Sequence, residues 1–195
     1  MQIKNNSSKY TNIIFIGKFA SGKSYFSKKL ETTLKSQYNL TIYRIHISAK
    51  IKDIAIDLFE MKGKDRRLLQ RIGEKMRSIN KDVWINYTIR YIRDNSKEPF
   101  IIEDLRLPRE YEIIKKNFPN TIAIKIEADN KIRLRVYKDI YGKMPTKEEL
   151  RDSTERLIND IKYDYLIKNN YDDKSSDLII NDIIKKFILK NKKII

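Results

Sequence analysis

Short apolar runs alternate along the chain with longer stretches whose apolar residues recur at helical spacing. The apolar runs predict five strands, at Asn12–Ile16, Leu40–Ile47, Pro99–Glu103, Thr121–Glu127 and Tyr165–Ile167. The other stretches predict helices, at Ser24–Gln37, Ile51–Phe59, Arg67–Asn95 (two helices broken near Asn80), Arg109–Asn117, Asn130–Ile140, Ser153–Tyr163 and Ser176–Lys192. Strands that alternate with helices are typical of an α/β fold, in which helices cover both faces of a parallel sheet.

The composition indicates a single folded domain over residues 1–195. Hydrophobic residues make up 41% of the chain, which is too much for a disordered sequence. No apolar run is long enough to span a membrane, and the first ten residues lack the apolar core of a secretory signal. The chain has no cysteine, which excludes disulfides and cysteine nucleophiles and permits a reducing, cytoplasmic setting.

The net charge of +16 leaves two interpretations open. A strongly basic protein can bind nucleic acid or attract phosphorylated substrates. The lysines are spread over the whole chain, however, as a general bias toward Ile, Lys and Asn would produce. We therefore expect no specific nucleic-acid partner.

One stretch has a spacing that indicates a definite chemistry. GKFASGKS, from Gly17 to Ser24, fits G-x-x-x-x-G-K-[ST] and uses two of only 5 glycines in the chain. It follows a predicted strand and opens a predicted helix, which is where a phosphate-binding loop must lie. We call residues 17–24 the phosphate loop. The residues predicted to bind the nucleotide are Gly17, Lys18, Ala20, Ser21, Gly22, Lys23, Ser24 and Tyr25.

Each position of the phosphate loop has a chemical reason. Glycine lets phosphate oxygens approach the backbone, and successive N–H groups then surround the anion. The ammonium of Lys23 can reach the β- and γ-phosphates, and the hydroxyl of Ser24 can ligate Mg²⁺. The sequence therefore predicts ATP and Mg²⁺ as cofactors.

A second informative stretch is PFIIEDLRLPRE, from Pro99 to Glu110. An apolar strand there ends in Glu103 and Asp104, and a carboxylate at this edge of the sheet can hold Mg²⁺ beside the phosphate loop. We expect Asp104 to be the ligand, because alternation points Glu103 elsewhere. Arg106 lies near the ligand crevice, and the alternative for Asp104 and Arg106 is a surface ion pair.

The absence of an N-K-x-D motif disfavours a GTPase, and the short chain disfavours a large motor, so a small kinase fits best. Arg133 precedes a loop with Gly142 and Pro145, within 141–150, that we expect to act as a lid. A guanidinium there can grip phosphate oxygens, although a solvated basic helix face is the alternative. The residues predicted to act in catalysis are Lys23, Asp104, Arg106 and Arg133.

The predicted acceptor side follows the second strand. Ser48 and Lys52 are candidate phosphate or sugar contacts, and Gln70 and Arg71 are candidates to contact an acceptor base and phosphate. Trp84 is a candidate acceptor contact or a core residue. His46, the only histidine, suits a structural role, because transfer between phosphates needs no histidine base.

Four blocks together resemble the deoxynucleoside monophosphate kinases of large DNA phages and viruses. They are GKFASGKS, LLQRIGEKMRSINKDVWINYTI, IIEDLRLPREYEII and STERLINDIKYDYLIKNN, and they cover roughly residues 11–185. The resemblance implies an adenylate-kinase-like fold with a five-stranded parallel core and a lid, ATP·Mg²⁺ as donor, and a deoxynucleoside monophosphate (dNMP) as acceptor. It places the protein in the host cytoplasm if its source is viral.

The resemblance also implies roles for individual residues. Asp104 and Arg106 would lie between donor and acceptor, Arg71 and Trp84 near the acceptor, and Glu155 after the lid. A serine–isoleucine–asparagine link at 78–80 and a lysine-rich lid depart from the family pattern. Animal-type phosphomevalonate kinase has a similar layout and is the rival within the enzymes. Two hypotheses from different classes of protein are a DNA-binding ATPase and a nucleotide-binding scaffold without turnover, and a homodimer is left open.

Overall fold

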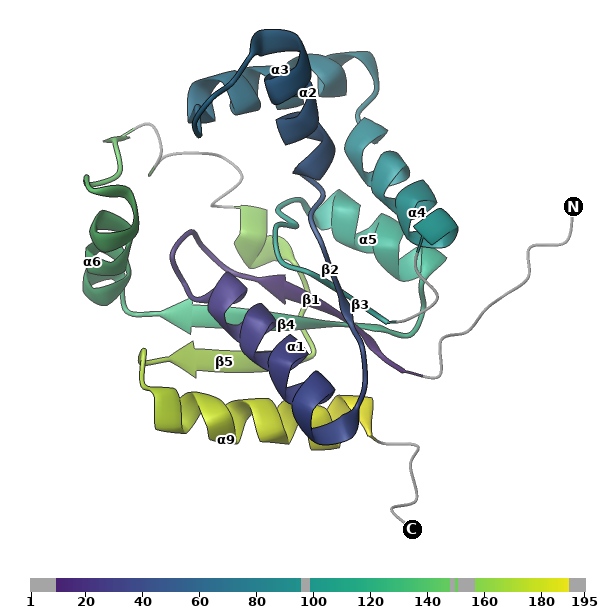
Figure 1. Cartoon of the computed structure of the whole chain (residues 1–195), viewed down its shortest axis with the longest axis vertical. Coiled ribbons are helices and arrows are strands. Elements are labelled where there is room, and N and C mark those ends of the chain that lie inside the picture. Colours follow the sequence, from purple (N-terminus) through teal and green to yellow (C-terminus); the bar gives the residue numbers. More distant parts are fainter. Residues whose placement is uncertain (1–9, 96–98, 148–149, 151–156, 190–195) are drawn as a thin grey trace, which may run out of the picture.

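The computed structural model describes residues 10–95, 99–147, 150 and 157–189. Its centre is one parallel sheet of five strands in the order β2-β3-β1-β4-β5 (Figure 1). The strands are β1 (Asn12–Ile16), β2 (Tyr43–Ile45), β3 (Phe100–Ile102), β4 (Thr121–Ala128) and β5 (Tyr165–Asn169). The predicted parallel sheet is confirmed. Only the middle of the predicted strand Leu40–Ile47 pairs with a neighbour, so β2 is shorter than expected.

Helices connect and follow these strands. They are α1 (Lys23–Tyr38), α2 (Ala49–Phe59), α3 (Arg66–Ile79), α4 (Val83–Asn95), α5 (Pro108–Asn117), α6 (Asn130–Tyr141), the 3₁₀ turn η1 (Ile158–Asp160), α9 (Asp173–Ile183) and the π-helical η2 (Ile184–Ile188). Two expectations were wrong in part. The described part of the predicted helix Ser153–Tyr163 is mainly the short turn η1, and Lys147 and Leu150, predicted to be loop, are helical.

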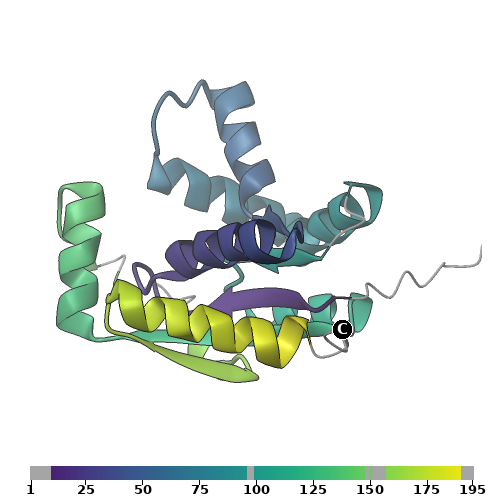
Figure 2. The same cartoon turned by 60° about the horizontal axis from the view of Figure 1, so that its bottom comes forward.

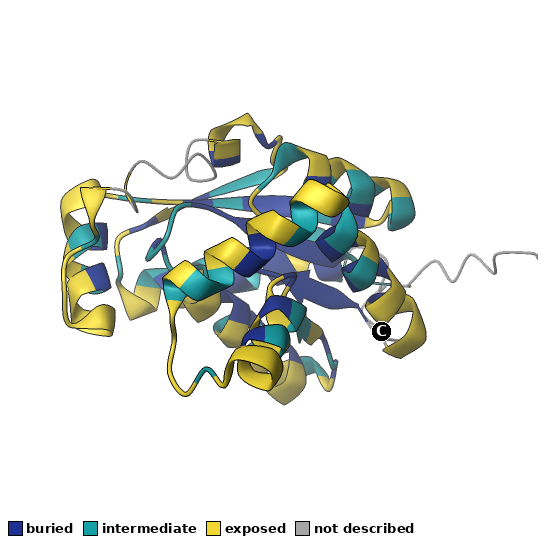
Figure 3. Ribbon diagram, turned by 90° about the horizontal axis from the view of Figure 1, so that it is seen from above, coloured by how far each residue is buried: buried dark blue, intermediate teal, exposed yellow. Residues whose placement is uncertain are grey.

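Two hydrophobic clusters hold the helices on the two faces of the sheet. On one face, Ile13, Phe15 and Ile101 pack with α1, α9 and η2. On the other, Ile14 and Ile102 pack with α2, α3, α4 and α5. Figure 2 shows α1 and α9 side by side over the sheet, and Figure 3 shows buried strands between helices whose outer faces are exposed.

The central position of β1 in the sheet determines where the loop after it lies. All five residues of β1 are buried, as expected for a central parallel strand covered on both faces. Because β3 pairs with one side of β1 and β4 with the other, the loop after β1 opens at the middle of the carboxyl edge. Ligands bind at this edge in open parallel sheets. Among the described residues, no helix combines the length and the apolar character needed to cross a membrane.

Candidate functional site

The backbone of the phosphate loop requires glycine at two positions. Gly17 has φ +154° and Gly22 has φ +102°, conformations that side-chain-bearing residues rarely adopt. A Cβ on Gly17 would stand 2.5 Å from the carbonyl oxygen of Ile126, and one on Gly22 would stand 2.4 Å from Nδ2 of Asn169. The two glycines thus allow β4 and the end of β5 to approach the loop closely.

Lys23 binds the first two carbonyls of the phosphate loop. Its Nζ donates hydrogen bonds to the carbonyl oxygens of Gly17, at 2.7 Å, and Lys18, at 2.8 Å. The ammonium group therefore lies over the loop from its position on the first turn of α1. From here a small change of rotamer can bring it to an anion held by the same loop.

Side chains from α6 and from the segment after β5 bind the next two carbonyls. Arg133 donates from Nη1 to the carbonyl oxygen of Phe19 at 3.0 Å, and its Cζ lies 4.3 Å from the centroid of the Phe19 ring. The hydroxyl of Tyr171 donates to the carbonyl oxygen of Ala20. Arg133 is only 5% exposed and contacts the phosphate loop, so it does not lie on a solvated helix face, which was the alternative; its catalytic role stays a prediction.

Asn169 completes this set, because its Nδ2 donates to the carbonyl oxygen of Ser21 at 2.9 Å. The carbonyls of residues 17–21 are thus all bound by side chains. The N–H of Ser21 donates to the carbonyl oxygen of Lys18 at 3.3 Å, which adds a bond within the loop. A loop held in this way at the start of a helix is the setting in which backbone N–H groups bind an anion.

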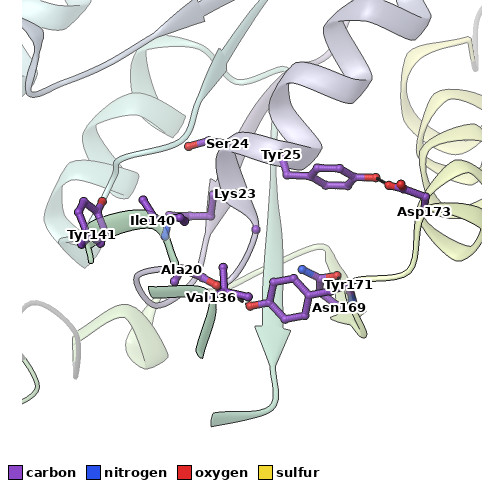
Figure 4. Close-up of a pocket in the computed structure, with 11 residues that line it drawn as sticks. Ala20, Lys23, Ser24, Tyr25, Val136, Ile140, Tyr141, Asn169, Tyr171 and Asp173 are labelled. Carbon is purple, nitrogen blue, oxygen red and sulfur yellow. Dashed lines mark hydrogen bonds between the residues drawn. The ribbon is translucent and has the colours of Figure 1, made fainter. Parts of the chain in front are cut away.

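A cavity of about 340 Å³ adjoins the phosphate loop (Figure 4). Three elements form it, which are the loop with the start of α1, one face of α6, and the segment that joins β5 to α9. Its lining residues are Ala20, Gly22, Lys23, Ser24, Tyr25, Val136, Ile140, Tyr141, Asn169, Tyr171 and Asp173. Tyr25 closes one side through a hydrogen bond from its hydroxyl to Asp173. Aromatic and aliphatic groups beside an anion cradle suit a flat, phosphate-bearing ligand.

Asp104 holds the start of α2 to the end of β3. Its Oδ1 accepts from the backbone N–H of Ile47 at 2.9 Å, and its Oδ2 accepts from the N–H and the hydroxyl of Ser48 at 2.9 and 2.6 Å. The structure therefore brings two predicted site residues, Asp104 and Ser48, into contact. The role of Asp104 as a metal ligand stays a prediction.

Glu103 points to the opposite side of the sheet, as alternation predicts. It is buried, and its Oε1 accepts from Nη2 of Arg44 at 2.6 Å and lies 3.4 Å from Nε2 of His46. Arg44 also lies 3.8 Å from Glu31 of α1, so the carboxylate of Glu103 lies on the face of the sheet that α1 covers. Among the described residues, none hydrogen-bonds to Oε2 of Glu103, so this oxygen can coordinate a bound cation or accept a hydrogen bond from its water.

Three of the predicted acceptor contacts lie on exposed positions of α2 and α3, away from the cavity beside the phosphate loop. Lys52 is on α2, and Gln70 and Arg71 are on α3, whereas Arg106, predicted to act in catalysis, is exposed after β3. Their contact with an acceptor stays a prediction. Lys52, Arg71 and Arg106 carry positive charge on exposed positions, and none of the three lines the cavity beside the phosphate loop.

Trp84 lies in the hydrophobic core, which was the alternative to an acceptor contact. It is 3% exposed, and its Nε1 donates to the carbonyl oxygen of Gly73 at 3.1 Å, which ties α4 to α3. Glu155 lies outside the described residues. Sequence reasoning missed Asn169 and Tyr171, although both lie within four residues of the end of the predicted strand Tyr165–Ile167, at the edge where ligands bind in parallel sheets.

Comparison by sequence finds no matching family model and no matching curated protein. Solved structures do match in fold. A sugar kinase from Janibacter has a TM-score of 0.59 at 11% identity, over 90% of this chain and 93% of that chain. A gluconokinase from Sinorhizobium meliloti has 0.55 at 10% identity, over 90% of both. A shikimate kinase from Acinetobacter baumannii, solved in complex with shikimate, has 0.54 at 13% identity, over 91% and 93%.

These identities are too low to show a shared activity, but the coverage extends over nearly all of each chain. The five-stranded parallel sheet, its flanking helices and the loop after β1 therefore constitute the fold of the P-loop kinases.

Proposed function

We propose that the protein is a kinase that transfers the γ-phosphoryl group of ATP to a dNMP, in the reaction ATP + dNMP = ADP + dNDP. The phosphate loop carries the donor half of this proposal. Side chains bind the five successive carbonyls of residues 17–21 and so fix the loop at the start of α1, where the helix adds its positive end.

The donor nucleotide would occupy the cradle and the adjoining cavity. Val136, Ile140 and Tyr141 of α6 offer an apolar wall to a base, and Tyr171 lies on the other side. Lys23 would leave its carbonyl partners to neutralise the β- and γ-phosphates. The cavity volume of about 340 Å³ suits a nucleoside-sized group.

Mg²⁺ fits the residues at this edge. The hydroxyl of Ser24 is exposed on the first turn of α1, and the carboxylates of Asp104 and Glu103 follow β3. Hydroxyl and carboxylate oxygens are the protein ligands that Mg²⁺ prefers. When bound, the ion would supply charge neutralisation on the transferred group.

The acceptor class is supported by the hydrogen bonding of Asp104. A hydroxyl acceptor benefits from a carboxylate base, but Asp104 already accepts three hydrogen bonds from Ile47 and Ser48, and Glu103 is 3% exposed with one oxygen held by Arg44. A phosphate acceptor is already anionic and needs no base, only cations that overcome charge repulsion. The exposed Lys52, Arg71 and Arg106 can supply those cations.

Measuring ADP and the phosphorylated product with Mg·ATP and each of the four dNMPs tests the proposal. Gluconate, shikimate, phosphomevalonate and DNA are the comparison arms, and Lys23→Ala is the control for the phosphate loop. We expect a dNDP from at least one dNMP and a loss of turnover in Lys23→Ala, with the fold retained. Turnover only with gluconate, shikimate or phosphomevalonate would overturn the acceptor, and DNA-stimulated hydrolysis alone would favour the DNA-binding ATPase.

A further inference from the structure

A cationic turn on the acceptor side meets an aromatic surface on the donor side. The turn joins α2 to α3, and it reaches toward the end of α6 in Figures 1 and 2. The guanidinium carbon of Arg66 lies 4.5 Å from the ring centroid of Tyr141 and 5.1 Å from that of Tyr137. The ammonium of Lys64 lies 5.2 Å from the Tyr141 ring and 3.4 Å from its hydroxyl.

The charges in this turn oppose local helix electrostatics. Arg66 is the first residue of α3, whose start is fixed by a hydrogen bond from the N–H of Leu68 to the side chain of Asp65. Asp65 is the only acidic residue at this helix start, and Lys64, Arg66 and Arg67 beside it bring a net positive charge to the positive end of the helix dipole. Such a local conflict is expected where the residues serve a site and not the helix itself.

Both tyrosines connect the turn to the donor site. Tyr141 lines the cavity beside the phosphate loop. Tyr137 is 1% exposed, and its ring packs edge-on against Phe19 of the phosphate loop, with 5.0 Å between the centroids. Arg66 is therefore linked to the donor cavity through one ring and to the phosphate loop through the other.

We propose that Arg66 is a positioning residue that clasps α3 to α6 through Tyr137 and Tyr141, so that closure of α2 and α3, which we call the acceptor arm, and occupation of the donor cavity favour each other. The assignment of donor and acceptor sides rests on the proposed function, whereas the clasp itself rests on these contacts. Coupling of this kind is reciprocal, because each ligand stabilises the closed arrangement that the other needs.

The electrostatics of Tyr141 agree with this arrangement. Burial raises the pKa of its hydroxyl, but the charges and hydrogen bonds of Lys64 and Arg66 outweigh it and lower the pKa overall. A cation over an aromatic ring contributes more when water is excluded from the contact. A ligand that fills the cavity against Tyr141 would exclude water in this way and strengthen the clasp.

The distance between the arm and α6 tests the clasp without any assumption about the acceptor. The chain has no cysteine, so Leu58→Cys on α2 and Lys138→Cys on α6, both exposed, can be spin-labelled as a unique pair. We expect a narrow distance distribution that narrows further with Mg·ATP. Arg66→Gln should broaden the distribution and lengthen the mean distance between the labels. Arg67→Gln, which removes the same charge from the next residue, should change neither.

A pair of substitutions at Tyr141 separates the ring from its hydroxyl. Tyr141→Phe keeps the ring and should keep the distance, whereas Tyr141→Leu should lengthen it. An unchanged distance in Arg66→Gln and Tyr141→Leu would overturn the clasp. Equal lengthening in Arg66→Gln and Arg67→Gln would overturn it as well, because general charge would then be the cause.

Kinetics of the intact enzyme supply the second readout. Arg66→Gln should raise the KM for ATP about 3- to 30-fold, which is the range expected for a lost cation–π contact. Arg66→Lys keeps a positive charge and should raise the KM by less. The melting temperature without ligand should fall by only a few degrees, and Mg·ATP should raise it less than it does in the parent protein, which separates positioning from stability. An unchanged KM in Arg66→Gln would contradict the coupling. A distance that responds in a protein that phosphorylates no dNMP would leave the clasp standing and overturn only the proposed function.

Discussion

Asn169 at the end of β5 holds the carbonyl oxygen of Ser21 in the phosphate loop through a hydrogen bond of 2.9 Å, between residues 148 positions apart. The side chain is 4% exposed, and its Oδ1 accepts from the N–H of Tyr171 at 2.8 Å. One amide thereby fixes both the loop and the segment that closes the adjoining cavity. The shape of the anion cradle thus depends on a strand at the edge of the sheet.

Asn169→Ala should weaken binding of Mg·ATP. It leaves the buried Ser21 carbonyl without this donor, at a cost of about 1–3 kcal/mol, which corresponds to roughly a 5- to 150-fold loss of affinity if the cost falls on the bound state. Titration calorimetry measures the affinity for Mg·ATP. Asn95→Ala is the control, because Asn95 donates a comparable bond to Tyr91 on an exposed helix. Equal affinity in the two variants would count against the role of Asn169.

Gly22→Ala should both destabilise the fold and abolish ATP binding. The added Cβ would stand 2.4 Å from Nδ2 of Asn169, at a backbone with φ +102°. Strain of this kind costs about 1–3 kcal/mol and would also move the loop. Gly63→Ala provides the match, because a Cβ there meets nothing within 4 Å, and it should leave both properties unchanged. Urea denaturation measures the stability of the two variants, and calorimetry measures their binding of Mg·ATP. Equal stability and equal binding in Gly22→Ala and Gly63→Ala would contradict the prediction.

Asp104→Asn should impair the start of α2 and the use of Mg²⁺ together. An amide NH₂ would face donors of Ile47 or Ser48, so we expect the acceptor KM to rise about tenfold or more from the cost of an unpaired donor. If Asp104 also contacts Mg²⁺ or its water, half-maximal activity will need more magnesium. Ser48→Ala removes one of the three hydrogen bonds and should leave the magnesium dependence as it is. A magnesium dependence that is the same in Asp104→Asn would remove Asp104 from the metal site.

Glu110 should make stability depend on pH in the weakly acidic range. Burial raises the pKa of its carboxyl above the ordinary value of 4.5, against the opposing hydrogen bonds from the N–H groups of Arg106 and Leu107 and the charge of Arg77. The folded state therefore holds this proton to higher pH than the unfolded state does. The contribution to stability is full below the unfolded pKa and is lost as pH rises through the folded pKa.

Glu110→Gln tests this assignment. Glutamine can still accept from Arg106 and Leu107 but does not titrate. Relative to the parent protein, the variant should gain free energy of unfolding as pH rises from about 4 to 7. Urea denaturation across that range measures the difference, and a difference that stays constant with pH would contradict the prediction.

The sequence determined the elements and the phosphate loop, because both depend on local chemistry. The apolar run Asn12–Ile16, followed by a motif with glycines at fixed spacing, specifies a strand, an anion-binding turn and a helix within 30 residues, and the structure has that order. The break between α3 and α4 near Asn80 was also predictable from its polar residues. The length of β2 was not, because a strand ends where its neighbour stops pairing, and β3 is short.

Only the tertiary structure decided which side chains surround the loop. Asn169, Tyr171 and Arg133 come from distant parts of the chain, and nothing in their local sequence specifies the carbonyl that each one binds. The same holds for Arg66 and Tyr141, whose local patterns indicate only a helix start and a helix end. Sequence periodicity records how a segment folds on itself, whereas contacts between segments depend on how the sheet and its helices pack, and packing is a property of the whole chain.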